Sequence, residues 1–378
     1  MPVLSKVEGL RATLRQACPE QSRRAQGAGG GGPFGLSLSK PSGLGDSPQA
    51  HRQPSEPAEP HPRIAHATTF QVVAPWHRLG NTSVSTLRFL PVFSSFSSRD
   101  LTPSTPLAEA PSRAASAALP ARGTVILIHG FSEHAGRYET TAARLQRLGW
   151  KTVAVTLKGH GRAGIRPDIE AFDDYLPPIV EVIDGLVEQG HSVETARPIV
   201  LLGQSMGALV ACRIALCRPS GVSGLILSSP AFGIADRMPR AALGLLGLLS
   251  RWLPALPIVP PPKGGAAALS QISQEQTRFE EDPLCWHGFL GLRMACQLAR
   301  ASMETEELLH RIDIPTLMLW GDADTVIDPD AIRRASRRMS PNLVTAEVWP
   351  GCRHHLFTDR DAESHFLKIR GWLEQRRA

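Results

Sequence analysis

Short apolar runs recur at regular intervals between residues 123 and 351, separated by longer stretches of mixed polarity. Each run is rich in Val, Ile and Leu and is bounded by glycine, proline or polar residues. Runs of this kind are typical of strands buried on both faces of a sheet. The predicted strands are 123–130, 151–157, 198–203, 223–230, 315–321 and 344–351, and two further runs, 68–75 and 85–93, predict a strand pair before them.

Segments of helical length and pattern lie between these runs, at 136–149, 172–190, 205–217, 330–339 and 361–376. Strands that alternate with helices predict βαβ units, and therefore an α/β fold with a mostly parallel central sheet and helices on both faces. In such sheets the active site lies at the carboxyl ends of the strands.

The pattern divides the chain into four parts. Residues 1–66 are rich in Gly, Pro, Ser and Arg without periodicity, which predicts a disordered low-complexity tail. Residues 67–230 and 312–378 are expected to form the α/β core. Residues 231–311 are too long for a single crossover, and we expect them to form an inserted cap.

The cap segment has an apolar first half, 241–262, and a second half, 270–310, that predicts polar-faced helices. The simplest expectation for the apolar half is that it packs onto the sheet. The alternative is a rim that faces lipid and gives the protein transient contact with a membrane surface.

Composition removes several classes of function. The first 63 residues carry eight basic and five acidic side chains, so about half of the net charge of +6 falls outside the expected core. No basic block with interleaved aromatic residues is present, which argues against nucleic-acid binding. The six cysteines show no CxxC pair, and no apolar leader or run of 18 apolar residues occurs. We therefore expect a cytoplasmic protein without a metal site.

The sequence IVLLGQSMGALVA, residues 199–211, places Ser205 between Gly203 and Gly207, where a predicted strand meets a predicted helix. A sharp strand-to-helix turn strains the serine backbone and leaves room only for glycine two residues before and after it. The turn exposes the hydroxyl and places the N–H of Met206 at a helix N-terminus, where it favours a developing oxyanion. Ser205 is therefore a candidate nucleophile and Met206 a candidate oxyanion donor.

A serine nucleophile needs a histidine base and a carboxylate that orients it, in the chain order serine, acid, histidine. Both follow the last two predicted strands. The acid candidates are Asp322, Asp324 and Asp328, and the base candidates are His354 and His355.

The motifs HGFSEHAGRY (129–138), GHG (159–161), GQSMG (203–207), GDAD (321–324) and GCRHH (351–355) occur in the order found in α/β-hydrolases. From about residue 70 to residue 376 the chain resembles the monoacylglycerol lipase and lysophospholipase branch, with its serine aminopeptidase-like domain. The resemblance implies Ser205 as nucleophile, Asp324 as acid and His354 as base, with the N–H groups of Phe131 and Met206 forming the oxyanion hole. It implies no cofactor.

The chain departs from the family at Thr156, where an aspartate is common, and at Ala163, where a serine is common. Neither position belongs to the triad. Structural roles are expected for His129, His134 and His160, since His134 lacks the H-E-x-x-H spacing of a metal pair.

These observations predict a serine hydrolase that cleaves a small-molecule lipid ester, either a monoacylglycerol or a lysophospholipid, through an acyl-enzyme on Ser205. Two alternatives remain open. An aminopeptidase could use the same triad and hold the substrate ammonium with Glu280, Glu281 or Asp282. A non-catalytic binding module of the same fold is the other.

Overall fold

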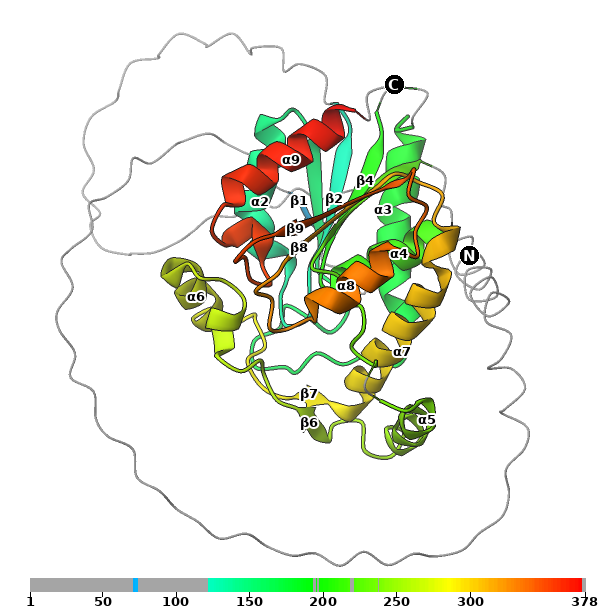
Figure 1. The fold of residues 1–378 in the computed structure, drawn as a ribbon, viewed down its shortest axis with the longest axis vertical. Helices are drawn as coiled ribbons and strands as arrows, with labels where there is room; N and C mark the ends of the chain where they lie inside the picture. The colour runs from blue at the N-terminus through cyan, green and yellow to red at the C-terminus, as the bar shows by residue number, and fades with distance from the viewer. Residues whose placement is uncertain are drawn as a thin grey trace, which may run out of the picture. The chain divides into compact units, whose positions relative to one another are not determined.

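The computed structural model describes residues 71–73, 122–192, 195, 197–217, 221–236 and 238–375 (Figure 1). The predicted tail, residues 1–66, and the second early strand, 85–93, lie outside these residues. All elements described below belong to one compact unit of the chain.

Seven strands form a central sheet in the order β1-β3-β2-β4-β5-β8-β9, and every pairing in it is parallel. The six strands predicted between residues 123 and 351 are all present. The strands are β1 (Gln71–Val73), β2 (Thr124–Ile128), β3 (Lys151–Val155), β4 (Ile199–Gln204), β5 (Val222–Ser228), β8 (Thr316–Gly321) and β9 (Val344–Trp349). Of the early pair, β1 extends the sheet beside β3, and its expected partner at 85–93 lies outside the described residues.

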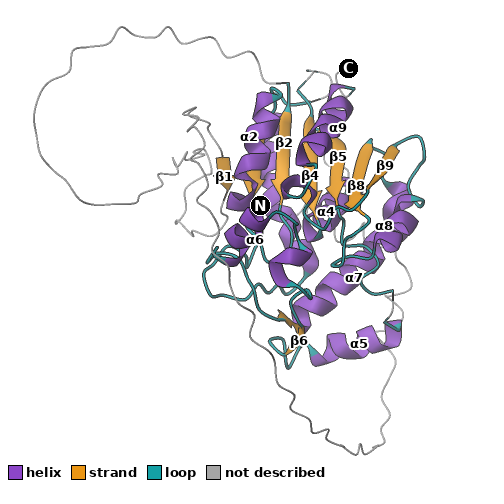
Figure 2. Ribbon diagram, turned by 60° about the vertical axis from the view of Figure 1, so that its left-hand side comes forward, coloured by secondary structure: helices purple, strands orange, loops and turns teal. Residues whose placement is uncertain are grey.

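Helices cover both faces of the sheet, as the alternation predicts (Figure 2). Alternate residues of the strands enter two separate cores, because neighbouring side chains of a strand point to opposite faces. One core packs against α2 and α9, and the other against α3, α4 and α8. The bounds are α2 (Glu139–Arg147), α3 (Leu176–Glu188), α4 (Met206–Leu216), α8 (Pro329–Ser336) and α9 (Ala362–Glu374), with 3₁₀ turns at Ala135–Tyr138, Phe172–Tyr175, Gly265–Ala268, Leu309–Arg311 and Leu356–Thr358.

The segment between β5 and β8 lies beyond the carboxyl ends of the strands (Figure 2). It contains α5 (Arg240–Leu249), β6 (Pro257–Val259), α6 (Ser273–Glu280), β7 (Leu290–Gly291) and α7 (Leu292–Leu308), and β6 pairs with β7 in antiparallel orientation. Helix α6 buries no residue, whereas α7 buries one face against α4 and α5.

The apolar stretch 241–262 does not pack onto the sheet, so the simpler expectation for it is wrong. Helix α5 rests on α7 and buries only Leu243. Leu245 is 68% exposed and Trp252 is 82% exposed, and several neighbouring leucines are also accessible. Among the residues that the structure describes, no helix combines the length and apolar character needed to cross a membrane.

Candidate active site

The turn between β4 and α4 has the strained form that the glycine spacing predicts. Ser205 adopts φ 53° and ψ −115°, a conformation that an L-residue adopts only under constraint. A Cβ on Gly203 would come within 2.6 Å of the Cα of Ala208, and one on Gly207 would overlap the carbonyl oxygen of Ile128. Only glycine fits at either position, so the two glycines allow the close packing that holds Ser205 in this turn.

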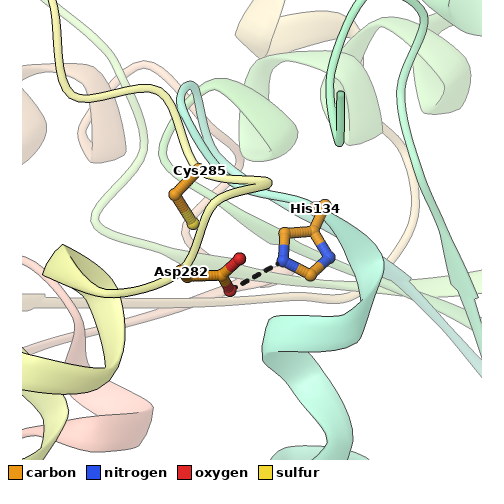
Figure 3. Close-up of side chains that lie close together, drawn as sticks. All are labelled: His134, Asp282 and Cys285. Atoms are coloured by element: carbon orange, nitrogen blue, oxygen red, sulfur yellow. Dashed lines mark hydrogen bonds and ion pairs between the residues drawn. The ribbon is translucent and has the colours of Figure 1, made fainter. Parts of the chain in front are cut away.

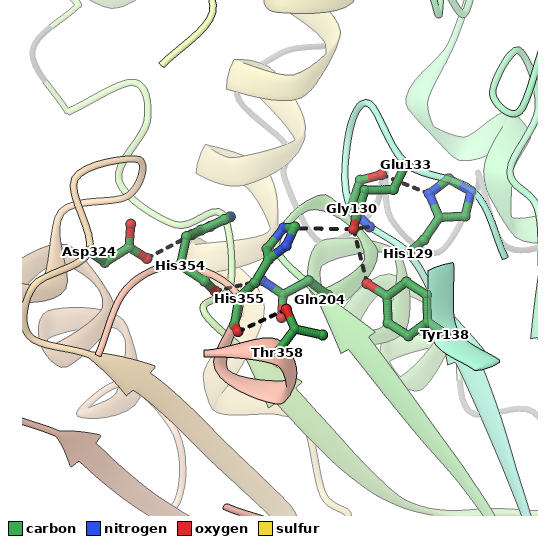
Figure 4. Close-up of polar contacts among 9 residues, drawn as sticks. All are labelled: His129, Gly130, Glu133, Tyr138, Gln204, Asp324, His354, His355 and Thr358. Carbon is green, nitrogen blue, oxygen red and sulfur yellow. Dashed lines mark hydrogen bonds and ion pairs between the residues drawn. The ribbon is translucent and has the colours of Figure 1, made fainter. Parts of the chain in front are cut away.

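The loops after β8 and β9 bring Asp324 and His354 together (Figure 4). His354 Nδ1 lies 2.7 Å from Asp324 Oδ2, and both residues are buried. Asp324 Oδ1 accepts the N–H groups of Val326 at 2.8 Å and Ile327 at 3.0 Å. Burial alone would raise the pKa of Asp324, but His354 and these hydrogen bonds lower it below its ordinary value. The carboxylate therefore stays ionised beside the imidazole at neutral pH.

The other acid candidates have structural contacts. Asp322 accepts the N–H of Gly351 at 2.6 Å and so closes the turn that leads to His354. Asp328 caps α8 by accepting the N–H of Asp330. Only Asp324 of the three contacts His354, as the resemblance implies.

One cavity of about 770 Å³ brings the candidate residues of the site together. Ser205, Met206, Phe131 and His354 all line it, and Asp324 lies behind His354. Within the described residues no hydrogen bond joins the Ser205 hydroxyl to His354. The side chain of Gln204, which precedes Ser205, links the two loops, because its Nε2 donates to the carbonyl oxygen of His354 at 2.9 Å.

The loop after β2 carries the second oxyanion candidate, Phe131, and is held by a residue whose role the sequence did not indicate. Glu133 accepts the N–H of Gly130 at 3.0 Å and the hydroxyl of Tyr138 at 3.0 Å (Figure 4). Its carboxylate is buried, and burial would raise its pKa, but electrostatic interactions with the neighbouring His355 and Arg137 side chains lower it overall. Glu133 thus fixes the turn in which Phe131 stands.

A family model described as serine aminopeptidase, S33, matches residues 120–361, which is more than half of the chain. The chain belongs to this family. A monoacylglycerol lipase of Mycolicibacterium smegmatis is 26% identical over 253 residues, 67% of this chain and 88% of the relative. The human monoglyceride lipase is 27% identical over 262 residues, 68% of this chain and 84% of the relative.

The structure of this S33 hydrolase is similar to that of a monoacylglycerol lipase from Paleococcus ferrophilus. The TM-score is 0.58 at 27% identity, and the match covers 68% of this chain and 96% of the other. Together with the parallel sheet, this likeness establishes the α/β-hydrolase fold predicted from the motifs.

A cluster of His134, Asp282 and Cys285 links the loop after β2 to the segment between β5 and β8 in this S33 hydrolase (Figure 3). One ligand atom from each residue lies within 4.8 Å of the others. His134 Nδ1 accepts the N–H of Gly136, so the ring proton is on Nε2, which donates to Asp282 at 2.9 Å. A metal bound at Nε2 would move that proton to Nδ1, against the N–H of Gly136. The donor set therefore fits a hydrogen bond and not a metal ion.

Three other histidines are uncharged at neutral pH, of which His129 and His160 are buried and His355 is partly buried at the cavity wall. Burial lowers the pKa of His129 to about 4, of His160 to about 3 and of His355 to about 4. His129 Nε2 accepts the N–H of Leu157 at 2.9 Å, so this nitrogen cannot gain a proton without losing that bond. His160 Nδ1 lies 3.0 Å from the carbonyl oxygen of Lys158, and these contacts agree with the structural roles expected for His129 and His160.

Because these histidines are uncharged in the folded chain, we expect the protein to lose stability when the pH is lowered mildly. In the unfolded chain they take up protons below about pH 6.5, whereas in the folded chain they stay neutral until the pH approaches 4. The unfolded state therefore binds more protons between these values, and the free energy of unfolding falls as the pH is lowered. Each histidine contributes about 1.4 kcal/mol per pH unit near pH 5. Urea unfolding of the protein at pH 7, 6 and 5 measures this slope.

His160→Phe supplies the control, because His160 packs edge-on against Phe131 within an aromatic cluster. The variant should reduce the change in the free energy of unfolding per pH unit by about one third of what the three histidines contribute together. A free energy of unfolding that does not change between pH 7 and pH 5 would contradict the prediction.

Proposed function

We propose that this protein is a lipid ester hydrolase of the serine type, with Ser205 as nucleophile, His354 as base and Asp324 as the acid that orients it. The observation that carries the proposal is the shared cavity wall, where a strained serine and a histidine held by a buried carboxylate meet. The curated relatives, named as lipases of monoacylglycerols, support the same class of reaction.

The proposed reaction has two steps. Ser205 Oγ attacks the ester carbonyl while His354 Nε2 takes its proton, and the N–H groups of Phe131 and Met206 stabilise the oxyanion. His354 then returns the proton to the leaving alcohol, and an acyl-enzyme remains. Water attacks this ester with His354 again acting as base, which releases the fatty acid and restores the serine. Asp324 holds the Nδ1–H of His354 throughout.

The cavity favours a neutral ester with a medium or long acyl chain. Most of its wall is apolar and comes from the segment between β5 and β8, including Leu243, Ile258, Val259, Leu290 and Leu298. The described lining residues include no Lys or Arg, and Glu280 is among them. A lysophospholipid phosphate would lack a cationic partner there and would face a carboxylate, so we favour a monoacylglycerol over a lysophospholipid.

Glu280 is the residue on which the aminopeptidase alternative depends. It is the one acidic candidate that lines the cavity, whereas Asp282 is bound to His134. A carboxylate at this place can accept from glycerol hydroxyls as well as from an ammonium group. The apolar area around it favours the ester.

We further propose that residues 231–311 act as the cap and that its exposed apolar face contacts a lipid surface. Leu245, Leu248 and Trp252 stand on the outer side of this segment, and Ile258 and Val259 are both partly exposed and part of the cavity wall. An apolar surface continuous with the cavity would let an acyl chain pass from a lipid layer to Ser205.

A substrate panel tests the proposal. Monooleoylglycerol should be hydrolysed at least about tenfold faster than oleoyl lysophosphatidylglycerol, because only the second carries a phosphate. Activity on nitrophenyl esters should rise from acetate to octanoate, and aminoacyl anilides should not be cleaved.

Two variants extend this test. Glu280→Gln should still hydrolyse monooleoylglycerol, and the ratio of its rate to that for oleoyl lysophosphatidylglycerol should be smaller than in the wild type. Trp252→Glu should slow hydrolysis of esters in vesicles but not of dissolved esters. Maximal activity on acetate or on aminoacyl anilides would overturn the assignment.

A further inference from the structure

The loop that follows β9 and carries His354 (residues 350–360, the base loop) is joined to a short part of the proposed cap. This part, residues 267–272 (the linking segment), ends just before α6. The N–H of His355 donates to the carbonyl oxygen of Leu269 in the linking segment at 2.8 Å. Leu269 also lines the substrate cavity. The proposed cap therefore contacts the neighbour of the candidate base at the cavity wall.

Asp359 makes a second connection between the linking segment and the base loop. The residue is buried, with 3% of its surface exposed, and its Oδ2 accepts the N–H of Arg353, the residue before His354, at 2.6 Å. Its Oδ1 accepts the N–H of Gln271 at 2.7 Å. Gln271 Nε2 in turn donates to the carbonyl oxygen of Gly351 at 2.7 Å. One buried carboxylate thus holds a backbone N–H of the linking segment and one of the base loop at the same time.

These bonds fix the main chain on both sides of His354. The chain is held one residue before it, at the N–H of Arg353, and directly after it, at the N–H of His355. Among the described residues Asp359 forms no hydrogen bond with the imidazole of His354, which is bound to Asp324 instead. Asp359 therefore acts on the base through the backbone. Such an effect is large, because a displacement of a catalytic group by about 1 Å can cost about 10²-fold in rate.

We infer that Asp359 is a positioning residue for the base, and that it acts by holding the linking segment on the base loop. The inference rests on the proposed function, since it takes His354 as the base, although the hydrogen bonds themselves do not depend on that role. The proposed cap is then more than a cover over the cavity, because its linking segment supports the triad. Asp359 is not among the residues that line the cavity, so its loss should disturb orientation and leave substrate binding intact.

Asp359→Asn tests this role. The asparagine oxygen can accept one of the two N–H groups, but its NH₂ group faces the other, so one bond is lost and two donors oppose each other. We expect kcat for monooleoylglycerol to fall by about 10- to 100-fold while KM changes by less than about twofold. The rate of fluorophosphonate labelling should fall by a similar factor, because Ser205 reacts with the probe only when the base is in place. Thermal unfolding shows whether the variant is folded at the assay temperature.

The Nδ1 proton of His354 gives a readout that a loss of stability alone would not change. His354 Nδ1 and Asp324 Oδ2 are 2.7 Å apart, and a proton in so short a charge-assisted bond gives a resonance far downfield in the proton NMR spectrum. In Asp359→Asn this resonance should move upfield or broaden, since the imidazole no longer has one fixed orientation. A fall in kcat with an unchanged resonance would contradict the inference.

Glu306→Gln is the matched control. Glu306 is also a buried carboxylate that accepts a backbone N–H, that of Gly233 at 2.8 Å, and it joins α7 to the loop after β5. Its other hydrogen bond is with Ser302 on α7, so neither contact reaches the base loop. The resonance should be that of the wild type, and kcat should stay within about twofold, whatever the effect on stability. An equal fall of kcat in both variants would overturn the inference.

The remaining outcomes separate this inference from the proposed function. A folded Asp359→Asn variant with the kcat and the resonance of the wild type would refute the inference and leave the hydrolase intact. A wild type that hydrolyses no ester would refute the proposed function instead. If Asp359→Asn does not fold, Gln271→Leu replaces it, because it removes the side-chain bond to Gly351 and keeps the backbone N–H that Asp359 accepts. Its kcat should fall at least about threefold with the same change in the resonance, and unchanged values would refute the inference.

Discussion

Replacement of Ser205 by alanine should lower kcat for monooleoylglycerol by a factor of at least about 10⁴, because no other group can form the acyl-enzyme. The strained turn is imposed by packing at Gly203 and Gly207, so alanine can take the serine backbone conformation without new contacts. The variant should therefore fold and keep the cavity. Hydrolysis kinetics together with labelling by a fluorophosphonate measure the loss, since the probe reacts only with an activated serine.

Ser132→Ala provides a matched control for this result. Ser132 lines the same cavity and, like Ser205, has a positive φ, here 71°. It should remain labelled and keep most of its activity, because within the described part of the chain Ser132 forms a hydrogen bond through its carbonyl oxygen alone, with the N–H of Trp286. Labelling of the Ser205→Ala variant at the wild-type rate would reject the proposed nucleophile. A wild type that is never labelled would favour the non-catalytic binding module.

The fold was predictable because its strands are read from local patterns. Strands β2 and β4 are buried on both faces, and this gives the continuous apolar runs from which they were expected. The nucleophile turn was predictable for a related reason, since a glycine is required wherever a Cβ has no space. A Cβ on Gly207, at the start of α4, would overlap the backbone of Ile128 at the end of β2, so the signal comes from packing and not from the turn alone.

The supporting residues of the site could not be found in the same way. Glu133 holds Gly130, three residues away, but a carboxylate in a loop has no pattern that separates this role from a solvated one. Gln204 and His354 are 150 residues apart, and their hydrogen bond depends on the packing of two loops. The exposed face of α5 was misjudged because periodicity shows that a helix has an apolar side but not what covers it.

The choice among the three aspartates also needed the structure. Asp322, Asp324 and Asp328 follow the same strand within seven residues, and residue type alone does not show which of them contacts the histidine. Their hydrogen bonds assign one to a turn, one to the histidine and one to a helix cap. The G-x-x-D position implied by the resemblance agrees with this geometry.

Asp324→Asn should reduce kcat by about 10⁴ while the protein stays folded. The asparagine oxygen can still accept the N–H groups of Val326 and Ile327, which directs its NH₂ group toward His354. His354 Nδ1 then has to accept a hydrogen bond, and the ring proton moves to Nε2. In this tautomer the nitrogen that faces the cavity can no longer take the proton of Ser205, so the nucleophile is not activated.

Asp328→Asn is the matched control, because it changes the same side chain four residues away at the cap of α8 and leaves His354 untouched. Its kcat should stay within about twofold of the wild type, since asparagine also caps helices well. Thermal unfolding of both variants separates a catalytic loss from a folding defect. If Asp324→Asn kept a tenth or more of the activity, His354 would not depend on this carboxylate for its tautomer, and the acid would have to be sought elsewhere on the cavity wall.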